Sequence, residues 1–239
     1  MRAFASSALT DRETLSVLLE INDVLDTHAL KDVRERINAL TFVDGSASAG
    51  ALARRVKHNL ELPSAEAASL SRDLLGPLLA HPQFQAAALP ARVSAATVAR
   101  YDVGMAYGEH TDDPVMGPAG TQQYRCDVAV TLMLSDDDSY AGGELCVRTP
   151  FGEQRARPRA GAALVYPASS LHAVAPVTRG VRLVGLAWVQ SLIASAEQRQ
   201  LLFDMWRVRD TLATALPDAE VTGETDRVYT NLVRMWAKP

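Results

Sequence analysis

The feature of this chain that most constrains its fold is a series of short apolar runs between residues 91 and 191. The runs have the length of β-strands, and turn signals such as "GPAG", "SDDD", "AGG" and "PFG" separate them. Short strands at such spacing are typical of an all-β sandwich or barrel. The predicted strands are "RVSAATVARY", "CDVAVTLML", "ELCVRT", "EQRAR", "AALVYP", "SLHAVAPV" and "VRLVGLAWVQ".

Helical patterns flank this core. Asp26 and Thr27 can begin a helix through "HALKDVRERINAL", and Ser64 can cap a second one in "SAEAASLSRDLLGPLLA", which Pro77 should kink or split. The stretches "SAEQRQLLFDMWRVRDTLATAL" and "DRVYTNLVRMW" predict helices after the core. We expect one α+β domain whose parts are a polar tail (1–14), an N-terminal helical support region (15–90) that begins with a strand in "LSVLLEI", the β core (91–191) and a C-terminal helical extension (192–239).

Composition narrows the class of protein. A net charge of −4 argues against nucleic-acid binding, which needs a strongly basic surface. No secretory signal and no apolar run long enough to span a bilayer is visible, so we expect a cytoplasmic protein without membrane association. Cys126 and Cys146 fit no thiolate metal pattern and are expected to be reduced.

Two histidines and one aspartate indicate a metal site. His110 and Asp112 form an H-x-D pair in "YGEHTDD", which alone is weak evidence because it arises readily by chance. His172, in a second part of the predicted barrel, completes a set of two imidazoles and one carboxylate. Such a facial triad holds non-haem Fe(II) and leaves coordination positions open.

Arg182 points to a ligand with two carboxylates. It lies in the apolar run "VRLVGLAWVQ", where a charged residue needs a partner. If "PVTRGVR" is a hairpin with Gly180 in its loop, Pro176 pairs with Arg182, and Arg182 then faces the same side of the sheet as His172. A dicarboxylate could bind the metal at one end and this guanidinium at the other.

These residues resemble the Fe(II)/2-oxoglutarate-dependent dioxygenases of the prolyl-hydroxylase type. The stretch "YDVGMAYGEHTD" carries their pattern at Tyr101, Gly104, Tyr107, His110 and Asp112. The chain is still more similar to the bacterial PKHD-type hydroxylases. Their blocks appear as "FVDGSASAG", "LLAHPQFQAAALP", "LSDDDSYAGGEL", "YPASSLHAVAPVTRGVRL", "WVQSLI", "QRQLLFDM" and "YTNLVRMW", so that the resemblance covers about residues 17–237.

The resemblance implies a double-stranded β-helix (jelly-roll) core and a hydroxylase that uses Fe(II), 2-oxoglutarate and O₂, with L-ascorbate as a reductant. It implies that Arg182 and Tyr101 bind 2-oxoglutarate, and Thr131 is a further candidate in that pocket. Met133 departs from the animal and plant relatives, which carry a second co-substrate tyrosine there, so another donor or a larger role for Arg182 is needed. Some PKHD-type relatives are associated with iron uptake.

The substrate is open, and a small molecule, a siderophore or a peptide fits equally. Candidate substrate or pocket residues are Tyr107, Trp188, Arg54, Lys57 and Asn59. The C-terminal helices could pack on the barrel or form a homo-oligomer interface. Two other functions remain open: a cupin-like metalloenzyme without 2-oxoglutarate, and a non-catalytic sensor of iron and 2-oxoglutarate. Arg182 and the Tyr101 motif argue against the first, and succinate release would exclude the second.

Overall fold

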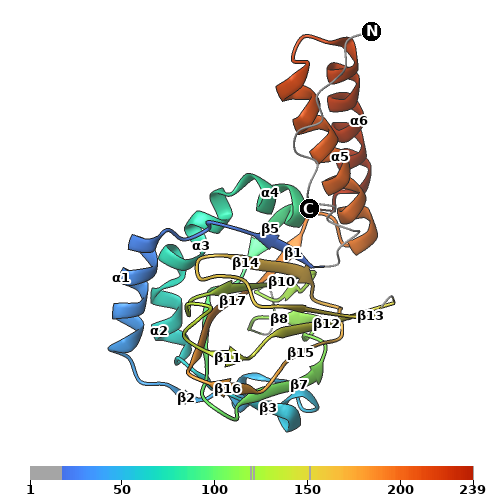
Figure 1. Cartoon of the computed structure of the whole chain (residues 1–239). Helices are drawn as coiled ribbons and strands as arrows, with labels where there is room; N and C mark the ends of the chain where they lie inside the picture. The colour runs from blue at the N-terminus through green and yellow to red at the C-terminus, as the bar shows by residue number, and fades with distance from the viewer. Residues whose placement is uncertain (1–17, 119, 121, 151, 239) are drawn as a thin grey trace.

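The computed structural model describes residues 18–118, 120, 122–150 and 152–238. Within them, two antiparallel sheets face each other as a jelly-roll barrel, helices cover one face of the larger sheet, and two long helices project from the body (Figure 1). The expected polar tail (1–14) and the start of the expected strand at 15–21 lie outside the described residues. The α+β class with a double-stranded β-helix core is confirmed.

The larger sheet has the order β1-β14-β10-β17-β6-β4-β2, and β5 pairs with the end of β17. Its strands are β1 (Leu19–Ile21), β2 (Val43–Asp44), β4 (Leu60–Glu61), β5 (Pro90–Val93), β6 (Thr97–Tyr101), β10 (Val128–Met133), β14 (Ala163–Pro167) and β17 (Arg182–Ser191).

The smaller sheet has the order β13-β12-β15-β7-β3. Its strands are β3 (Lys57–His58), β7 (Ala106–His110), β12 (Leu145–Thr149), β13 (Gly152–Ala156) and β15 (His172–Val174). Two further strand pairs join β8 (Val115–Met116) to β9 (Tyr124–Arg125), and β11 (Ala141–Gly142) to β16 (Val177–Arg179).

Helices α1 (Thr27–Asn38), α2 (Ser64–Ser69), α3 (Ser71–Ala80) and α4 (Pro82–Ala88) cover the outer face of the larger sheet (Figure 1). Alternate residues of β10, Val130 and Leu132, pack against them, while Thr131 and Met133 face the barrel interior. Both faces of β10 are therefore buried, which explains why its sequence is an almost continuous apolar run.

Local details of the N-terminal helices differ from expectation. Asp26 caps α1 as predicted, accepting a hydrogen bond from the Ala29 amide. The second predicted helix breaks at Leu70 instead of at Pro77, because the Leu70 amide closes a tighter turn on the Ala67 carbonyl. Ser64 does not cap it but begins it, after Pro63. Helix α4 was not predicted, although a proline in the first turn is a recognised start signal.

The N-terminal region also contributes strands to the barrel. β1 pairs with β14, β4 pairs with β6, and β3 pairs with β7, so residues before the predicted core extend both sheets. Two short 3₁₀ turns, η1 (Gly45–Ser48) and η2 (Ala53–Val56), lie between β2 and β3. Because β3 and β4 are only two residues long, their hydrophobic pattern cannot be distinguished from that of a loop.

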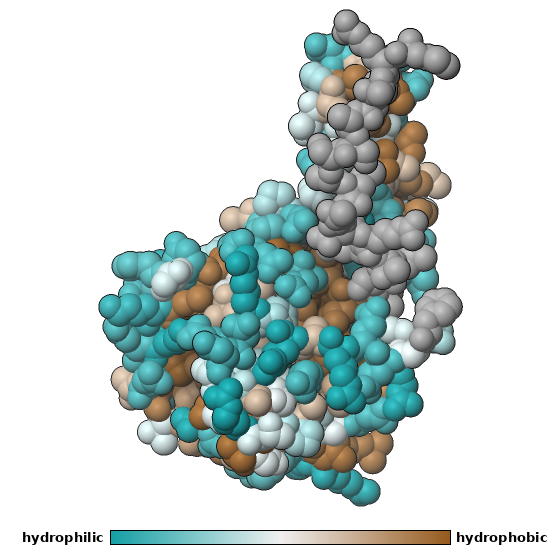
Figure 2. Space-filling view, in the orientation of Figure 1, coloured by the Kyte–Doolittle hydropathy of each residue, from teal (hydrophilic) through white to brown (hydrophobic). Residues whose placement is uncertain are grey.

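Helices α5 (Ala196–Ala215) and α6 (Glu220–Trp236) form an arm that projects from the barrel (Figure 1). The first turns of α5 bury Arg199, Leu202 and Phe203, whereas no residue of α6 is buried. Figure 2 shows apolar side chains on the surface of this arm. The exposed apolar residues there are Leu201, Val208, Leu216, Val221, Val228 and Met235. No helix among the described residues has the length and apolar character needed to cross a bilayer.

Arg199 should anchor the arm to the barrel. The residue is 5% exposed, and its guanidinium donates hydrogen bonds to the carbonyls of Ile193, Ala194 and Asp127 at 2.8–3.0 Å. We expect Arg199→Met to lower the free energy of unfolding by about 3 kcal/mol, because it leaves buried carbonyls without donors. Urea unfolding measures this change. Arg227→Met, which removes an exposed pair on α6, is the control and should change stability by less than about 0.5 kcal/mol. An equal effect of both changes would contradict the anchoring role.

Candidate active site

His110, Asp112 and His172 converge at one end of the barrel. Each offers one ligand atom, and these three atoms lie within 4.8 Å of one another. The two histidines pair directly across neighbouring strands β7 and β15. The Asp112 Oδ1 atom lies 4.0 Å from His110 Nε2 and 3.8 Å from His172 Nε2. The tertiary structure thus brings together the three residues that the sequence predicted as metal ligands.

Hydrogen bonds set the orientation of both imidazoles. His110 Nδ1 donates to the Gly108 carbonyl at 2.8 Å, and His172 Nδ1 donates to the Ser170 carbonyl at 2.9 Å. Since a carbonyl can only accept, the proton lies on Nδ1 and the Nε2 lone pair is free to face the site. Burial, followed by the nearby His172, lowers the pKa of His110 to about 4, so this ring is neutral at physiological pH.

The carboxylate of Asp112 is suited to a cation. Burial raises the pKa of Asp112, and its Oδ2 atom is buried without a hydrogen-bond partner in the described part of the chain. Two neutral imidazoles and a buried carboxylate with an unsatisfied oxygen form a donor set that fits a divalent transition metal. Tyr107 stacks on His110 at 3.6 Å between ring centroids, and Tyr166 meets His172 edge-on at 5.1 Å, so aromatic rings shield both imidazoles.

The predicted hairpin before Arg182 is wrong. Residues 177–179 form β16, which pairs with β11, whereas Arg182 begins β17 and pairs with Tyr101 of β6. Between these strands the chain passes from the two-stranded β11–β16 sheet to the larger sheet, so the two successive strands do not pair with each other. Arg182 and His172 therefore lie on facing sheets and line one cavity, not one face of a single sheet.

Arg182 is a buried cation without a carboxylate partner among the described residues. It is 1% exposed, and its Nε atom has no hydrogen-bond partner. Its guanidinium carbon lies 5.1 Å from the centre of the Tyr101 ring, a cation–π contact. Burial raises the pKa of Tyr101 to about 12, and the nearby Arg182 charge lowers this pKa by a smaller amount. A buried guanidinium beside a cavity calls for an anion there.

The inner face of the larger sheet presents its side chains in rows across the strands. Arg182 pairs with Tyr101, and Leu186 pairs with both Thr131 and Thr97. Trp188 continues the same face of β17 toward the candidate metal ligands. Burial raises the pKa of Asp112, and the His172 charge and then the nearby Trp188 indole oppose that rise. The sequence-predicted residues Tyr101, Thr131, Tyr107 and Trp188 all line the cavity, whose volume is about 240 Å³.

The three N-terminal candidates have different surroundings. Lys57 lines the cavity, donates to Glu61 Oε1 at 2.5 Å and lies 5.3 Å from the centre of the Tyr107 ring. Asn59 also lines the cavity and is 2% exposed. Arg54 is exposed, and its guanidinium donates to loop carbonyls of η1 and its flank instead of lining the cavity.

Sequence reasoning missed several cavity residues. Glu61 is buried as the partner of Lys57, Thr97 faces Thr131 across Leu186, and Tyr166 contacts His172. The opposite charge of Glu61, four residues after Lys57 in "KHNLEL", is the signal that could have found it, because a buried lysine needs a carboxylate partner.

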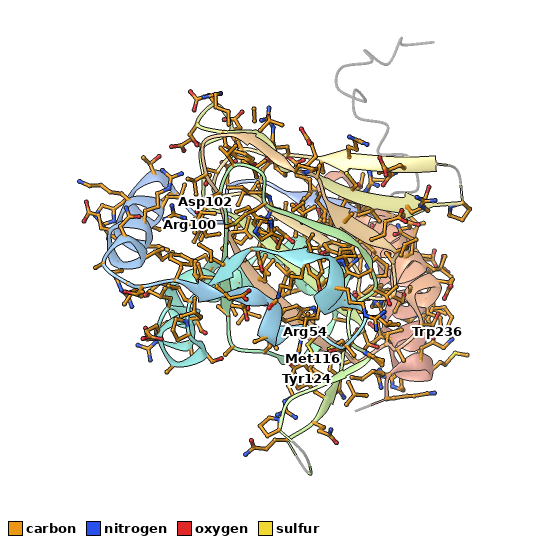
Figure 3. The ribbon with its side chains drawn as sticks, turned by 90° about the horizontal axis from the view of Figure 1, so that it is seen from below. Arg54, Arg100, Asp102, Met116, Tyr124 and Trp236 are labelled. Atoms are coloured by element: carbon orange, nitrogen blue, oxygen red, sulfur yellow. The ribbon has the colours of Figure 1, made fainter. Side chains whose placement is uncertain are left out.

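Met116 of the β8–β9 pair marks the rim of the cavity. It lines the cavity and pairs with Tyr124. Seen from below, Arg54 appears on the same side of the view as these two residues and away from the Arg100–Asp102 ion pair (Figure 3). The cavity therefore has η1, η2 and the β8–β9 pair around one side.

The β core of the chain matches a known protein family. Residues 96–190, from β6 to the end of β17, match the family model of the 2OG-Fe(II) oxygenase superfamily. This range contains the metal triad, Tyr101 and Arg182. Only the N-terminal cavity residues lie outside it.

Relatives that match over nearly the whole chain show a narrower family. A PKHD-type hydroxylase of Thioalkalivibrio sulfidiphilus is 48% identical over 92% of this chain and 99% of its own length. One from Stenotrophomonas maltophilia is 40% identical over 93% of this chain and 100% of its own length. The protein belongs to the PKHD-type hydroxylases.

A solved structure supports the fold. The prolyl hydroxylase of Trichoplax adhaerens, in complex with a hypoxia inducible factor oxygen degradation domain peptide fragment, is similar with a TM-score of 0.53. It is 18% identical, and the match covers 77% of this chain and 86% of that one. At this identity the similarity concerns the barrel and carries no information about substrate.

Proposed function

We propose that this protein is an Fe(II)- and 2-oxoglutarate-dependent dioxygenase that hydroxylates a small-molecule or peptide substrate and converts 2-oxoglutarate to succinate and CO₂. One observation carries the proposal. The candidate metal triad and a buried Arg182, which has no carboxylate partner among the described residues, line the same cavity, with the two histidines and Arg182 on facing sheets. A metal site next to an uncompensated cation suits a co-substrate that has a chelating end and a free carboxylate.

Each residue has a physical task in this scheme. His110, Asp112 and His172 would hold Fe(II), with the Nδ1–H groups fixed on backbone carbonyls so that the rings cannot turn away. Arg182 binds the far carboxylate of 2-oxoglutarate, and the Tyr101 hydroxyl assists it. Thr131 lies two rows farther along the same face of the sheet, beyond the row of Val184, and is placed to contact the same ligand.

Fe(II) and 2-oxoglutarate together supply the oxidation of a substrate C–H bond by O₂, which no amino-acid side chain provides. The protein contributes orientation and exclusion of water. Tyr107, Tyr166 and Trp188 line the cavity with apolar rings around the triad. The short η1–η2 segment closes another side through Ser48, Ala49, Gly50 and Ala53. A dry site strengthens the ionic contact between Arg182 and a carboxylate.

The two alternatives fit less well. A cupin-like metalloenzyme without 2-oxoglutarate has no use for Arg182, whose burial without an anion is unfavourable. A non-catalytic sensor of iron and 2-oxoglutarate requires the same ligands as the enzyme, so turnover must separate the two.

The proposal is tested by anaerobic titration of the purified protein with Fe(II) and 2-oxoglutarate. By family resemblance, we expect a visible metal-to-ligand charge-transfer band that needs both additions. After O₂ is admitted, succinate should form, and ascorbate is expected to prolong turnover by keeping iron reduced. Metal binding without the band would exclude the 2-oxoglutarate assignment. A band without any succinate, even with candidate small-molecule and peptide substrates present, would favour the sensor.

A further inference from the structure

The cluster of buried side chains around Tyr101 contains one residue that cannot donate a hydrogen bond. Met133, which stands where animal and plant relatives have a co-substrate tyrosine, is buried in a cluster with Tyr101 and Val184. Its thioether has no hydrogen to donate. Each carboxylate oxygen can accept more than one hydrogen bond, so Arg182 and Tyr101 leave room for a third donor.

Asn59 has an unused donor at this place. It is 2% exposed and lines the cavity, yet neither Nδ2 nor Oδ1 has a hydrogen-bond partner in the described part of the chain. The Tyr101 hydroxyl is close enough for the amide to lower the pKa of Tyr101 slightly, but the two groups do not reach hydrogen-bond geometry. A buried amide without partners is costly, and a native protein that retains one calls for an explanation such as a bound group that completes its hydrogen bonds.

The backbone around Asn59 is built to admit its side chain. The Gly45 amide donates to the Asn59 carbonyl at 3.0 Å, which holds the two segments together. A Cβ atom at Gly45 would lie 2.3 Å from Asn59 Oδ1, so any other residue there would displace the amide. The η1 turn thus packs closely over Asn59 and still offers its side chain no hydrogen bond.

Strand register places Asn59 in the same row as the two predicted co-substrate residues. Arg182 pairs with Tyr101, and Leu60 pairs with Arg100. Extending this register by one residue beyond β4 sets Asn59 opposite Tyr101, and all three residues line the cavity. Neighbouring strands are about 4.8 Å apart. The Arg182 guanidinium lies 5.1 Å from the centre of the Tyr101 ring, between the strands of the same sheet.

We propose that the Asn59 carboxamide donates a hydrogen bond to the carboxylate of 2-oxoglutarate that lies farthest from the metal, in place of the donor that Met133 lacks. This inference rests on the proposed function. It adds a co-substrate-binding residue that lies outside the stretch matched by the family model.

Tyr140 is the other unpartnered donor near Arg182. Its hydroxyl is buried without a partner, and the Arg182 charge lowers its pKa, although burial raises that pKa more. However, Tyr140 does not line the cavity, whereas Asn59 does. Tyr140→Phe removes a comparable buried donor without opening the site, which makes it the matched control.

The test compares two ligands in calorimetric titrations of the protein loaded with Mn(II), which avoids turnover. 2-Oxoglutarate has both carboxylates, and 2-oxobutanoate has the same chelating end without the far carboxylate. We expect Asn59→Leu to weaken 2-oxoglutarate binding about 10- to 100-fold and to leave 2-oxobutanoate binding unchanged. Asn59→Asp, which puts a negative charge beside the carboxylate, should weaken 2-oxoglutarate binding further. Tyr140→Phe should bind both ligands like wild type.

Thermal unfolding gives a second readout. Because the Asn59 amide has no partner, Asn59→Leu should leave the Tm of the ligand-free protein unchanged or raise it, while the Tm increase on adding 2-oxoglutarate shrinks. A lower ligand-free Tm would mean that the amide serves the fold and would overturn the assignment.

Three binding results would overturn the inference: unchanged affinity of Asn59→Leu for 2-oxoglutarate, an equal loss for both ligands, or the selective loss in Tyr140→Phe instead. If wild type itself binds no 2-oxoglutarate, the proposed function fails together with this inference. The wild-type titration therefore distinguishes a failure of the proposed function from a failure of the Asn59 assignment alone.

Discussion

His172→Ala is expected to weaken binding of Fe(II), or of Co(II) as a spectroscopic probe, by more than about 100-fold and to reduce succinate formation below detection. The change removes one of the three ligand atoms that lie within 4.8 Å of one another. Losing even a hydrogen-bonding partner of a metal ligand typically costs 10- to 100-fold in affinity, and losing the ligand itself should cost more. Anaerobic metal titration measures the affinity, and product analysis measures succinate.

His28→Ala is the control for this experiment. His28 is exposed on α1, its side chain forms a surface pair with Asp32, and it lies outside the cavity. It should bind metal and turn over like wild type. His172 is itself buried, so circular dichroism must show that His172→Ala is folded. A folded His172→Ala protein that retains wild-type metal affinity would refute the triad.

Arg182→Leu is expected to have opposite effects on co-substrate binding and on stability. Binding of 2-oxoglutarate to the metal-loaded protein should weaken by between about 30- and 4000-fold, because losing one partner of a buried charged pair costs about 2–5 kcal/mol. The ligand-free protein should be as stable as wild type or more stable, because the substitution removes a buried cation without a carboxylate partner. Calorimetric titration and thermal unfolding measure the two effects.

Arg155→Leu provides the comparison. Arg155 is exposed on β13 and pairs with Glu153, so its loss should change neither 2-oxoglutarate binding nor Tm appreciably. If Arg182→Leu instead lowered the ligand-free Tm by as much as the loss of a core residue does, Arg182 would be serving the fold. The assignment of the far carboxylate to Arg182 would then be wrong.

The β core could be predicted well because its strands have alternating or continuous apolar patterns that depend on nearby residues alone. Strand β17 is an example: odd-numbered residues such as Ala187 and Val189 pack toward the helices, and even-numbered residues such as Trp188 face the cavity. The candidate metal triad was accessible for a different reason. Two imidazoles and a carboxylate are common metal ligands, and few histidines were available to complete the H-x-D pair.

The hairpin before Arg182 shows where local reasoning failed. The stretch "PVTRGVR" has the composition of a tight turn, and composition alone does not reveal whether the next strand pairs with the previous one. In the structure β16 and β17 belong to different sheets, so Arg182 faces His172 across the cavity. Pairing between strands depends on contacts that are distant in sequence, which is why it was the least predictable property.

The sequence by itself determined the barrel class and singled out His110, Asp112 and His172 as candidate metal ligands and Arg182 as a cation that needs an anion, because each follows from residue chemistry or short-range periodicity. The sequence named Arg54, Lys57 and Asn59 as candidate pocket residues, and only the tertiary structure decided that Lys57 and Asn59 line the cavity together with Glu61 while Arg54 does not. It also showed that Lys57 and Glu61 pair with each other, whereas the Asn59 amide has no hydrogen-bond partner among the described residues. Burial and partnership arise from packing between distant segments, so only the folded chain distinguishes a paired polar residue from one that awaits a ligand.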